Sequence, residues 1–210
     1  MIKITYNAGR QNKIHILVDG EYFTTVDAEY WFTCKWWEKA ELSDETEIEE
    51  FYKDTGSRYA FISGLRVLSY GDNSRKELRR KLITKGHKAE YVDAALDSLE
   101  EYGFVNDKRF AEVLASRLMR TKHMSAKGIK NEMLLKGISR EIADEVLGEI
   151  EFDPVDDIVT LLQGKYKKYL YDEKGIKKTV AGLQRLGYNW SDIKSAMNKV
   201  DVDGEDDFND

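Results

Sequence analysis

Apolar residues and glycines recur along this chain in three similar stretches that lie about 50 residues apart. The first follows Ser74, the second follows Ser125 and the third follows Gly175. Each stretch carries apolar residues at helical spacing up to a glycine, and these glycines are Gly86, Gly137 and Gly187. Self-similarity at a fixed period is typical of helical repeat proteins, in which each unit covers the apolar face of its neighbour. Because such proteins present extended surfaces, the pattern favours a binding protein over an enzyme.

The beginning of the chain has a different period. Apolar and polar residues alternate over residues 2–6 and 14–18, and Asp19-Gly20 separates the second run from Tyr22-Phe23. Strict alternation predicts strands, and Asp-Gly between two such runs is a strong hairpin signal. We expect a three-stranded antiparallel sheet over residues 1–26.

The chain after residue 26 carries helical patterns throughout. We expect helices over about 27–42, 43–55, 58–70, 74–86, 88–102, 107–122, 126–136, 139–150, 154–170, 176–186 and 191–200. Gly56-Ser57 separates the second of these from the third, Ser74 and Glu77 form a capping box, and Asp153-Pro154 starts a helix.

These elements predict a mainly α fold. We expect three tandem three-helix repeats in an elongated, right-handed-type helical stack, preceded by a small N-terminal antiparallel β-sheet and helices. The expected segments are an N-terminal extension (1–56), three repeats (57–105, 106–150 and 151–200) and an acidic, disordered tail (201–210).

The net charge of −6 is unevenly distributed. Residues 1–66 have a net charge of −4, residues 67–150 and 151–200 have +2 each, and the last ten residues have −6. A weakly basic body with an acidic tail differs from a uniformly acidic protein. The tail either aids solubility or competes with nucleic acid for the basic body. The single Cys34 fits a reducing compartment, and we expect a cytoplasmic protein.

Basic residues gather in two regions that could contact phosphates. The first set, on the helix expected over 74–86, is Arg75, Lys76, Arg79, Arg80, Lys81 and Lys85. The second set, interleaved with tyrosines, is Lys165, Lys167, Lys168, Lys174, Lys177 and Lys178. Lys122, Lys127 and Lys130 could join the two sets along one side. The alternative is a merely solvated basic face, and for the second set the core spacing of Leu162, Tyr166 and Tyr169-Leu170 favours packing.

The remaining residue types do not form a recognisable catalytic or metal site. His15, His87 and His123 are scattered, and no cysteine or carboxylate pair lies at ligand spacing. We therefore expect no enzyme activity, no cofactor and no metal. Trp31, Trp36 and Trp37 crowd one expected helix and most simply pack on the sheet. Trp37 falls off the centre of this apolar stripe, so the alternative is an exposed Trp37 that contacts a partner.

Specific motifs resemble the RecX family. They are Ser74–Leu82 with Lys85-Gly86, Leu99 with Gly103–Ala111, Lys127–Ile129 with Glu132, and Leu135–Ile138 with Ile142. Leu183–Tyr188 and Ile193 are a looser echo, so the resemblance covers roughly residues 58–200, and Gly103–Ala111 is its most specific part. The net acidity, the acidic tail and Gly175 in place of serine depart from what that family leads us to expect.

The resemblance implies a regulator of the RecA recombinase in DNA repair, homologous recombination and the SOS response. Family members bind the RecA–single-stranded DNA filament along its groove and inhibit ATP hydrolysis and strand exchange. The implied partners are the RecA filament and single-stranded DNA, directly or within the filament. Because no apolar run reaches membrane-spanning length, we expect no membrane partner, and we expect a monomeric protein. The alternatives are a sequence-independent single-stranded DNA-binding module that competes with recombinase, and a helical scaffold for another protein.

Within the most specific motif we expect structural roles. Asp107 lies near a helix start, where a carboxylate accepts free backbone N–H groups. Phe110 and Ala111 fill the joint between two repeats, and Arg109 belongs to the same motif.

Overall fold

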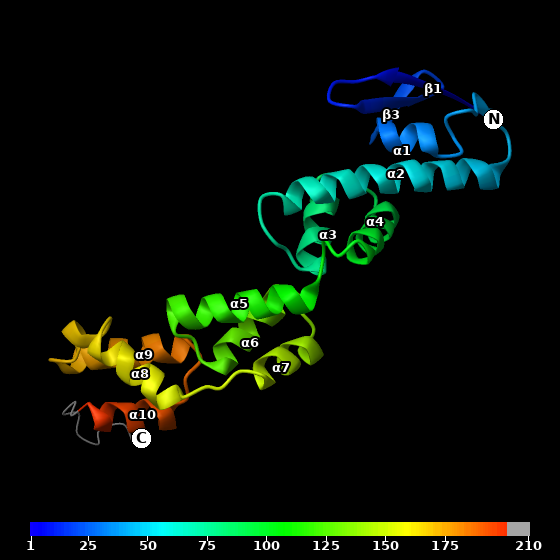
Figure 1. Cartoon of the computed structure of the whole chain (residues 1–210). Coiled ribbons are helices and arrows are strands. Elements are labelled where there is room, and N and C mark those ends of the chain that lie inside the picture. The colour runs from blue at the N-terminus through cyan, green and yellow to red at the C-terminus, as the bar shows by residue number, and fades with distance from the viewer. Residues whose placement is uncertain (201–210) are drawn as a thin grey trace. The chain divides into compact units, whose positions relative to one another are not determined.

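The N-terminal segment forms a four-stranded antiparallel sheet in a computed structural model that describes residues 1–200 (Figure 1). Its strands are β1 (Ile2–Ala8), β2 (Lys13–Val18), β3 (Glu21–Asp27) and β4 (Glu41–Leu42), in the order β3-β2-β1-β4. Asp19 and Gly20 have φ of 52° and 86°, as a two-residue hairpin turn requires. The three predicted strands are confirmed. The fourth, which is only two residues long, was not predicted.

The predicted helix over residues 27–42 is wrong beyond its first turns. Helix α1 (Ala28–Thr33) ends at the extended residue Cys34, and the chain then turns before β4. Trp31 and Trp36 explain the early end, because both are buried. Residues five apart on a helix point about 140° apart, so a continuous helix would expose one of these rings. The turn buries both, and Trp36 Nε1 donates to Asp54 Oδ2 at 3.0 Å.

The predicted break at residues 56–57 is also wrong, because helix α2 runs without interruption from Glu45 to Leu68. Its glycines allow close packing on helix α4 (Ala89–Glu101). A Cβ atom at Gly56 would lie 2.5 Å from the Tyr91 ring, and one at Gly64 would lie 2.7 Å from Leu99 Cδ1. Gly56 therefore marks a close contact between two helices rather than a helix end.

The other helices follow the predicted order. They are α3 (Arg75–Thr84), α5 (Asp107–Lys122), α6 (Ala126–Leu135), α7 (Arg140–Gly148), α8 (Pro154–Gln163), α9 (Glu173–Arg185) and α10 (Trp190–Lys199). The side chains of Ser74 and Asp153 accept the predicted capping hydrogen bonds at the starts of α3 and α8. Helix α8 is shorter than predicted. Gly164 leaves the helical conformation, and a short 3-10 helix, η1 (Lys167–Tyr169), follows.

Gly86, Gly137 and Gly187 follow the ends of α3, α6 and α9 with φ of 93°, 87° and 94°. The left-handed conformation favours glycine, so all three end their helices as predicted. Gly187 has a second role, since a Cβ atom there would lie 2.4 Å from the backbone nitrogen of Gly128.

The described residues divide between Asn106 and Asp107 into two compact units. The first unit holds one buried cluster at the sheet and another formed by α2, α3 and α4. The second unit holds one cluster formed by α5–α7 and another by α8–α10. The mainly helical fold with a small N-terminal sheet is confirmed. The five segment boundaries and the stacking of the repeats stay predictions, and the tail over 201–210 lies outside the described residues.

Candidate nucleic-acid and filament interface

Helix α3 uses part of its basic set to hold helix α4. Arg79 binds Asp93 with two hydrogen bonds, of 2.6 and 2.9 Å, and Arg75 pairs with Asp97 at 2.7 Å and with Glu100. The hydrogen bonds from Arg79 lower the pKa of the Asp93 carboxyl below its ordinary value. These two arginines therefore have partners within the protein before any ligand binds.

The other four basic residues of the first set form no ion pair with an acid of residues 1–200. Lys81 donates a hydrogen bond to Asn73, while Lys76, Arg80 and Lys85 are exposed and form no ion pair with any of residues 1–200. Lys76 and Arg80 are four residues apart, so they share a helical face. We call Lys76, Arg80 and Lys85 the α3 outer cations.

Of the three lysines predicted to join the two basic sets, one is paired with an acid of residues 1–200 and two are not. Lys130 pairs with Asp144, which connects α6 to α7. Lys122 and Lys127 are exposed and form no ion pair within the described part of the chain. All three lie in the second unit, whereas α3 lies in the first, so their joining role stays a prediction.

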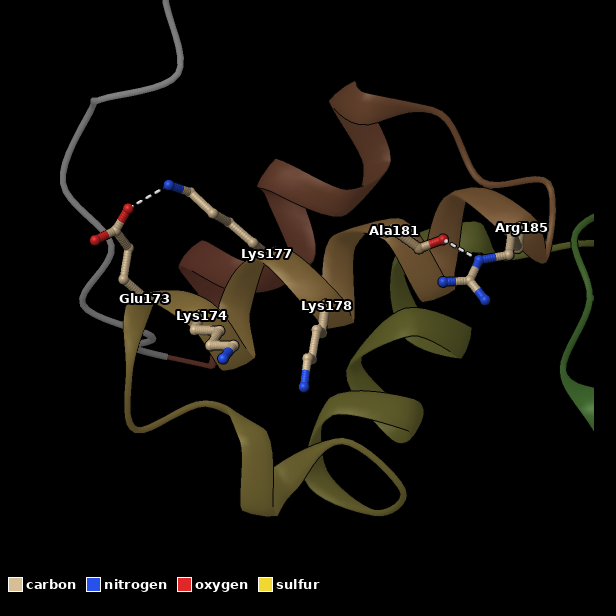
Figure 2. A pocket seen from close by; sticks show the side chains of 6 residues that line it. All are labelled: Glu173, Lys174, Lys177, Lys178, Ala181 and Arg185. Carbon is tan, nitrogen blue, oxygen red and sulfur yellow. Dashed lines mark hydrogen bonds and ion pairs between the residues drawn. The ribbon is translucent and has the colours of Figure 1, made fainter.

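Helix α9 presents a cationic face beside a hollow (Figure 2). Lys174, Lys178, Ala181 and Arg185 are spaced four, three and four residues apart, which places them on one side of the helix. They line a hollow of about 470 Å³ together with Glu173 and Lys177, which pair with each other. Arg185 Nε donates to the Ala181 carbonyl at 3.2 Å, which holds the start of its guanidinium along the helix. Lys174 and Lys178 form no ion pair within residues 1–200.

A second hollow of about 210 Å³ adjoins the first, because Lys174 and Lys178 line both. Lys168, Tyr169 and Tyr171 come to it from η1 and the following turn. Tyr169 is 41% exposed and Tyr171 is 81% exposed, and the Lys168 ammonium lies 5.1 Å from the Tyr169 ring centroid. We call Lys168, Lys174, Lys178 and Arg185 the α9 basic groove.

Of the apolar residues and tyrosines that we expected to pack among the second basic set, only some are buried. Leu162 and Tyr166 are buried in the α8–α10 cluster, and Leu170 packs against it. Tyr169, in contrast, faces the solvent beside the groove. Lys165 and Lys167 are exposed but line neither hollow.

Arg185 is a groove residue that the sequence reasoning missed. The signal was available, because Arg185 continues the face of Lys174 and Lys178 at helical spacing. Arg185 nevertheless stands apart from the run of lysines that ends at Lys178, because none of residues 179–184 is basic. Such a row of cations beside exposed aromatic rings suits phosphate binding with base stacking.

The motif residues around the start of α5 pack within one three-helix unit, and the expected role of Phe110 and Ala111 at the joint between two repeats stays a prediction. Helix α5 begins at Asp107, Ala111 is fully buried in the α5–α7 cluster, and Phe110 packs against that cluster. Arg109 is exposed on the same helix.

Residues 1–200 contain neither a metal-binding cluster nor a membrane-spanning helix. No group of three or more His, Cys, Asp or Glu residues is placed to hold a metal ion. No helix in this part of the chain is long and apolar enough to cross a membrane.

Three-helix units that follow a small N-terminal β-sheet define a class of mainly helical proteins, and comparison with known proteins identifies the family within that class. Residues 60–99 match the model of the first three-helix domain of RecX, and residues 106–147 match that of the second. A regulatory protein RecX of Clostridium perfringens is 30% identical over 196 residues, which cover 90% of each chain. A second, from Clostridium tetani, is 28% identical and covers 94% of this chain and 93% of its own. The chain belongs to the RecX family.

Solved structures agree with this assignment at the level of the fold. A crystal structure of regulatory protein RecX superimposes with a TM-score of 0.68 at 20% identity, covering 94% of this chain and all of that one. RecX from Lactobacillus salivarius gives a TM-score of 0.59 at 25% identity, covering 70% of this chain and 97% of its own. The protein is thus a member of a family of regulatory proteins.

Proposed function

We propose that this protein regulates the RecA recombinase by binding the RecA–single-stranded DNA filament, where it limits ATP hydrolysis, filament growth and strand exchange. The α9 basic groove is the observation that supports this most directly. Its cations form no ion pair within residues 1–200, and they line hollows of about 470 and 210 Å³. The α3 outer cations provide a second contact in the other unit. The protein acts as a cytoplasmic monomer and is not itself an enzyme, so any effect on ATP hydrolysis acts through the ATPase of its partner.

The test is RecA ATP hydrolysis on saturating single-stranded DNA, with this protein titrated from far below to equal the RecA concentration. We expect inhibition well below one molecule per RecA protomer, and we expect it to persist when DNA is in excess. No inhibition at any ratio would overturn the proposal.

A matched pair of variants tests the groove. Lys174→Glu with Lys178→Glu removes two cations from it, while Lys165→Glu with Lys167→Glu makes the same charge change at exposed positions outside it. Each phosphate contact contributes about 0.7 to the slope of log affinity against log salt for a single strand. The groove variant should therefore lower that slope by about 1.4 relative to the control.

A second candidate function is direct, sequence-independent binding of single-stranded DNA in competition with recombinase. The exposed Tyr169 and Tyr171 beside the groove favour it, because bases stack on such rings. Excess DNA distinguishes the two functions, because it abolishes inhibition by simple competition.

A further inference from the structure

Strand β1 has an open edge in its second half. The Asp19 N–H donates to the Lys3 carbonyl at 2.8 Å, and the Gly9 N–H donates to the Lys13 carbonyl at 2.7 Å. These bonds place the main-chain groups of the odd-numbered residues on the β2 side, because hydrogen-bonded pairs alternate in an antiparallel ladder. The even-numbered residues of β1 therefore direct their N–H and C=O groups toward the opposite edge.

The short strand β4 covers only the beginning of that edge. Ile2 pairs with Leu42, and the Ile4 N–H donates to the Ala40 carbonyl at 2.7 Å. The main-chain groups of Tyr6 and Ala8 extend past this point, where no described residue pairs with them. Unpaired strand edges are ready templates for an added strand.

Exposed aromatic rings lie next to the open edge. Tyr6, Phe32 and Trp37 are 42%, 46% and 40% exposed. The Tyr6 and Phe32 centroids are 5.9 Å apart, and those of Phe32 and Trp37 are 6.0 Å apart, so the three rings form one aromatic patch. The patch joins β1 to α1 and to the turn after α1, and it offers contacts to side chains on one face of an added strand.

The charges around the patch disfavour nucleic acid. Lys35 pairs with Glu50 at 2.6 Å, and Lys39 pairs with Glu47 at 2.5 Å, so the nearby lysines are neutralised. Acidic side chains close to the patch in the sequence are exposed and form no ion pair with residues 1–200. They are Glu29, Glu38 and Glu41. Lys3 and Arg10, on either side of residues 5–8, are exposed as well, and these three acids exceed those two cations by one charge. This balance favours a cationic peptide over a phosphate backbone.

We propose that residues 5–8 of β1 bind an extended segment of a partner protein by β-strand addition. The segment carries apolar or aromatic side chains at alternate positions, which contact the aromatic patch, and lysine or arginine at a flank. Its main chain pairs with Tyr6 and Ala8. This site shares no residue with the basic faces of α3 and α9, so a result that refutes one of the two proposals leaves the other unaffected.

Selection from a display library of random ten-residue peptides on the full chain tests the proposal. We expect enriched sequences with alternating apolar positions and a basic flank. A synthetic peptide of the enriched sequence, N-methylated at one residue at a time, should lose binding with a period of two. Only alternate N–H groups of an added strand face β1.

Variants of the protein complete the test. Ala8→Pro removes an N–H that faces the open edge and leaves the β2-facing bonds of its neighbours in place, so it should abolish binding of that peptide. Trp37→Ala and Phe32→Ala should each weaken it about tenfold. Tyr70→Ala, which removes an 83% exposed ring elsewhere in the same unit, should leave it unchanged.

Three outcomes would overturn the proposal. One is selection that yields no alternating sequence, and another is equal binding by wild type and Trp37→Ala. The third is concentration-dependent dimerisation of the wild type in sedimentation that Ala8→Pro or Trp37→Ala removes, which would assign the edge to a second copy of this chain. If Ala8→Pro does not fold by circular dichroism, the N-methylation period and the two aromatic variants still decide.

Discussion

Gly128 provides a sharp test of the packing inside the second unit. It lies within α6, and replacing a glycine by alanine inside a helix normally raises stability by about 1 kcal/mol. Here the opposite is expected. A Cβ atom at Gly128 would lie 2.2 Å from the carbonyl oxygen of Leu186, a backbone atom at the end of α9.

The magnitude follows from that contact. A distance of 2.2 Å is roughly 1 Å short of an ordinary carbon–oxygen contact, so the start of α6 must move away from Leu186. The movement breaks the hydrogen bond from the Ser125 N–H to the Leu186 carbonyl, which is 3.1 Å long, and loss of such a buried bond costs about 1–3 kcal/mol. Loss of the tight contact between α6 and Gly187 adds to this. After the gain in helix propensity is subtracted, we expect Gly128→Ala to destabilise the second unit by about 2 kcal/mol.

Gly148→Ala is the matched control, because Gly148 lies at the end of α7 in the same unit and a Cβ atom there would meet nothing within 4 Å. Hydrogen exchange followed by mass spectrometry reports the local free energy of opening in peptides from α6 and α10. Exchange should accelerate about 30-fold for Gly128→Ala, since 1.4 kcal/mol corresponds to tenfold, and should stay the same or slow for Gly148→Ala. If the amides of α6 and α10 exchange at the same rate in both variants, the inferred clash between a Cβ atom at position 128 and the Leu186 carbonyl is refuted.

Three further predictions concern charge. Lys76→Glu with Arg80→Glu should weaken filament binding and lower its salt slope without loss of stability. Arg75→Glu with Arg79→Glu should in addition lower the melting temperature, because those arginines hold α4. Equal melting temperatures of the two double variants would contradict this distinction. Deletion of residues 201–210 removes six acids and should steepen the salt dependence of filament binding, and an unchanged slope would refute competition by the tail. Burial raises the pKa of Asp27, but the hydrogen bond from Arg58 and the Tyr30 N–H lower it more, so its net pKa is below the ordinary value. The contribution of the Asp27 carboxylate to stability is therefore present above the unfolded-state pKa and is lost as pH falls through the folded-state pKa. In thermal melts, Asp27→Ala should destabilise the first unit by about 1 kcal/mol at pH 7 and by less below pH 3.

The sequence predicted most helices because their ends are encoded locally. Ser74 caps α3 with its own hydroxyl, and Gly86 ends that helix with a left-handed conformation, so neither end depends on distant contacts. The errors arose where tertiary packing overrides local signals. Gly56 looks like a helix break in the sequence, but it is a close contact with Tyr91, and no local pattern distinguishes these two uses of glycine.

The candidate interface was only partly predictable for a related reason. A basic residue in the sequence does not reveal whether an acid on another helix neutralises it, and the partners of Arg79 and Lys130 lie 14 residues further along the chain. Helix α4 supplies three acids to the arginines of α3, so the densest basic run in the sequence is a less open surface than α9. Along α9 the only ion pair within residues 1–200 joins Glu173 to Lys177 at its first turn, which leaves Lys174 and Lys178 open to a ligand. The count of basic residues along the sequence favours α3 for phosphate binding, whereas the ion pairs between α3 and α4 lead us to predict that α9 binds phosphate more strongly.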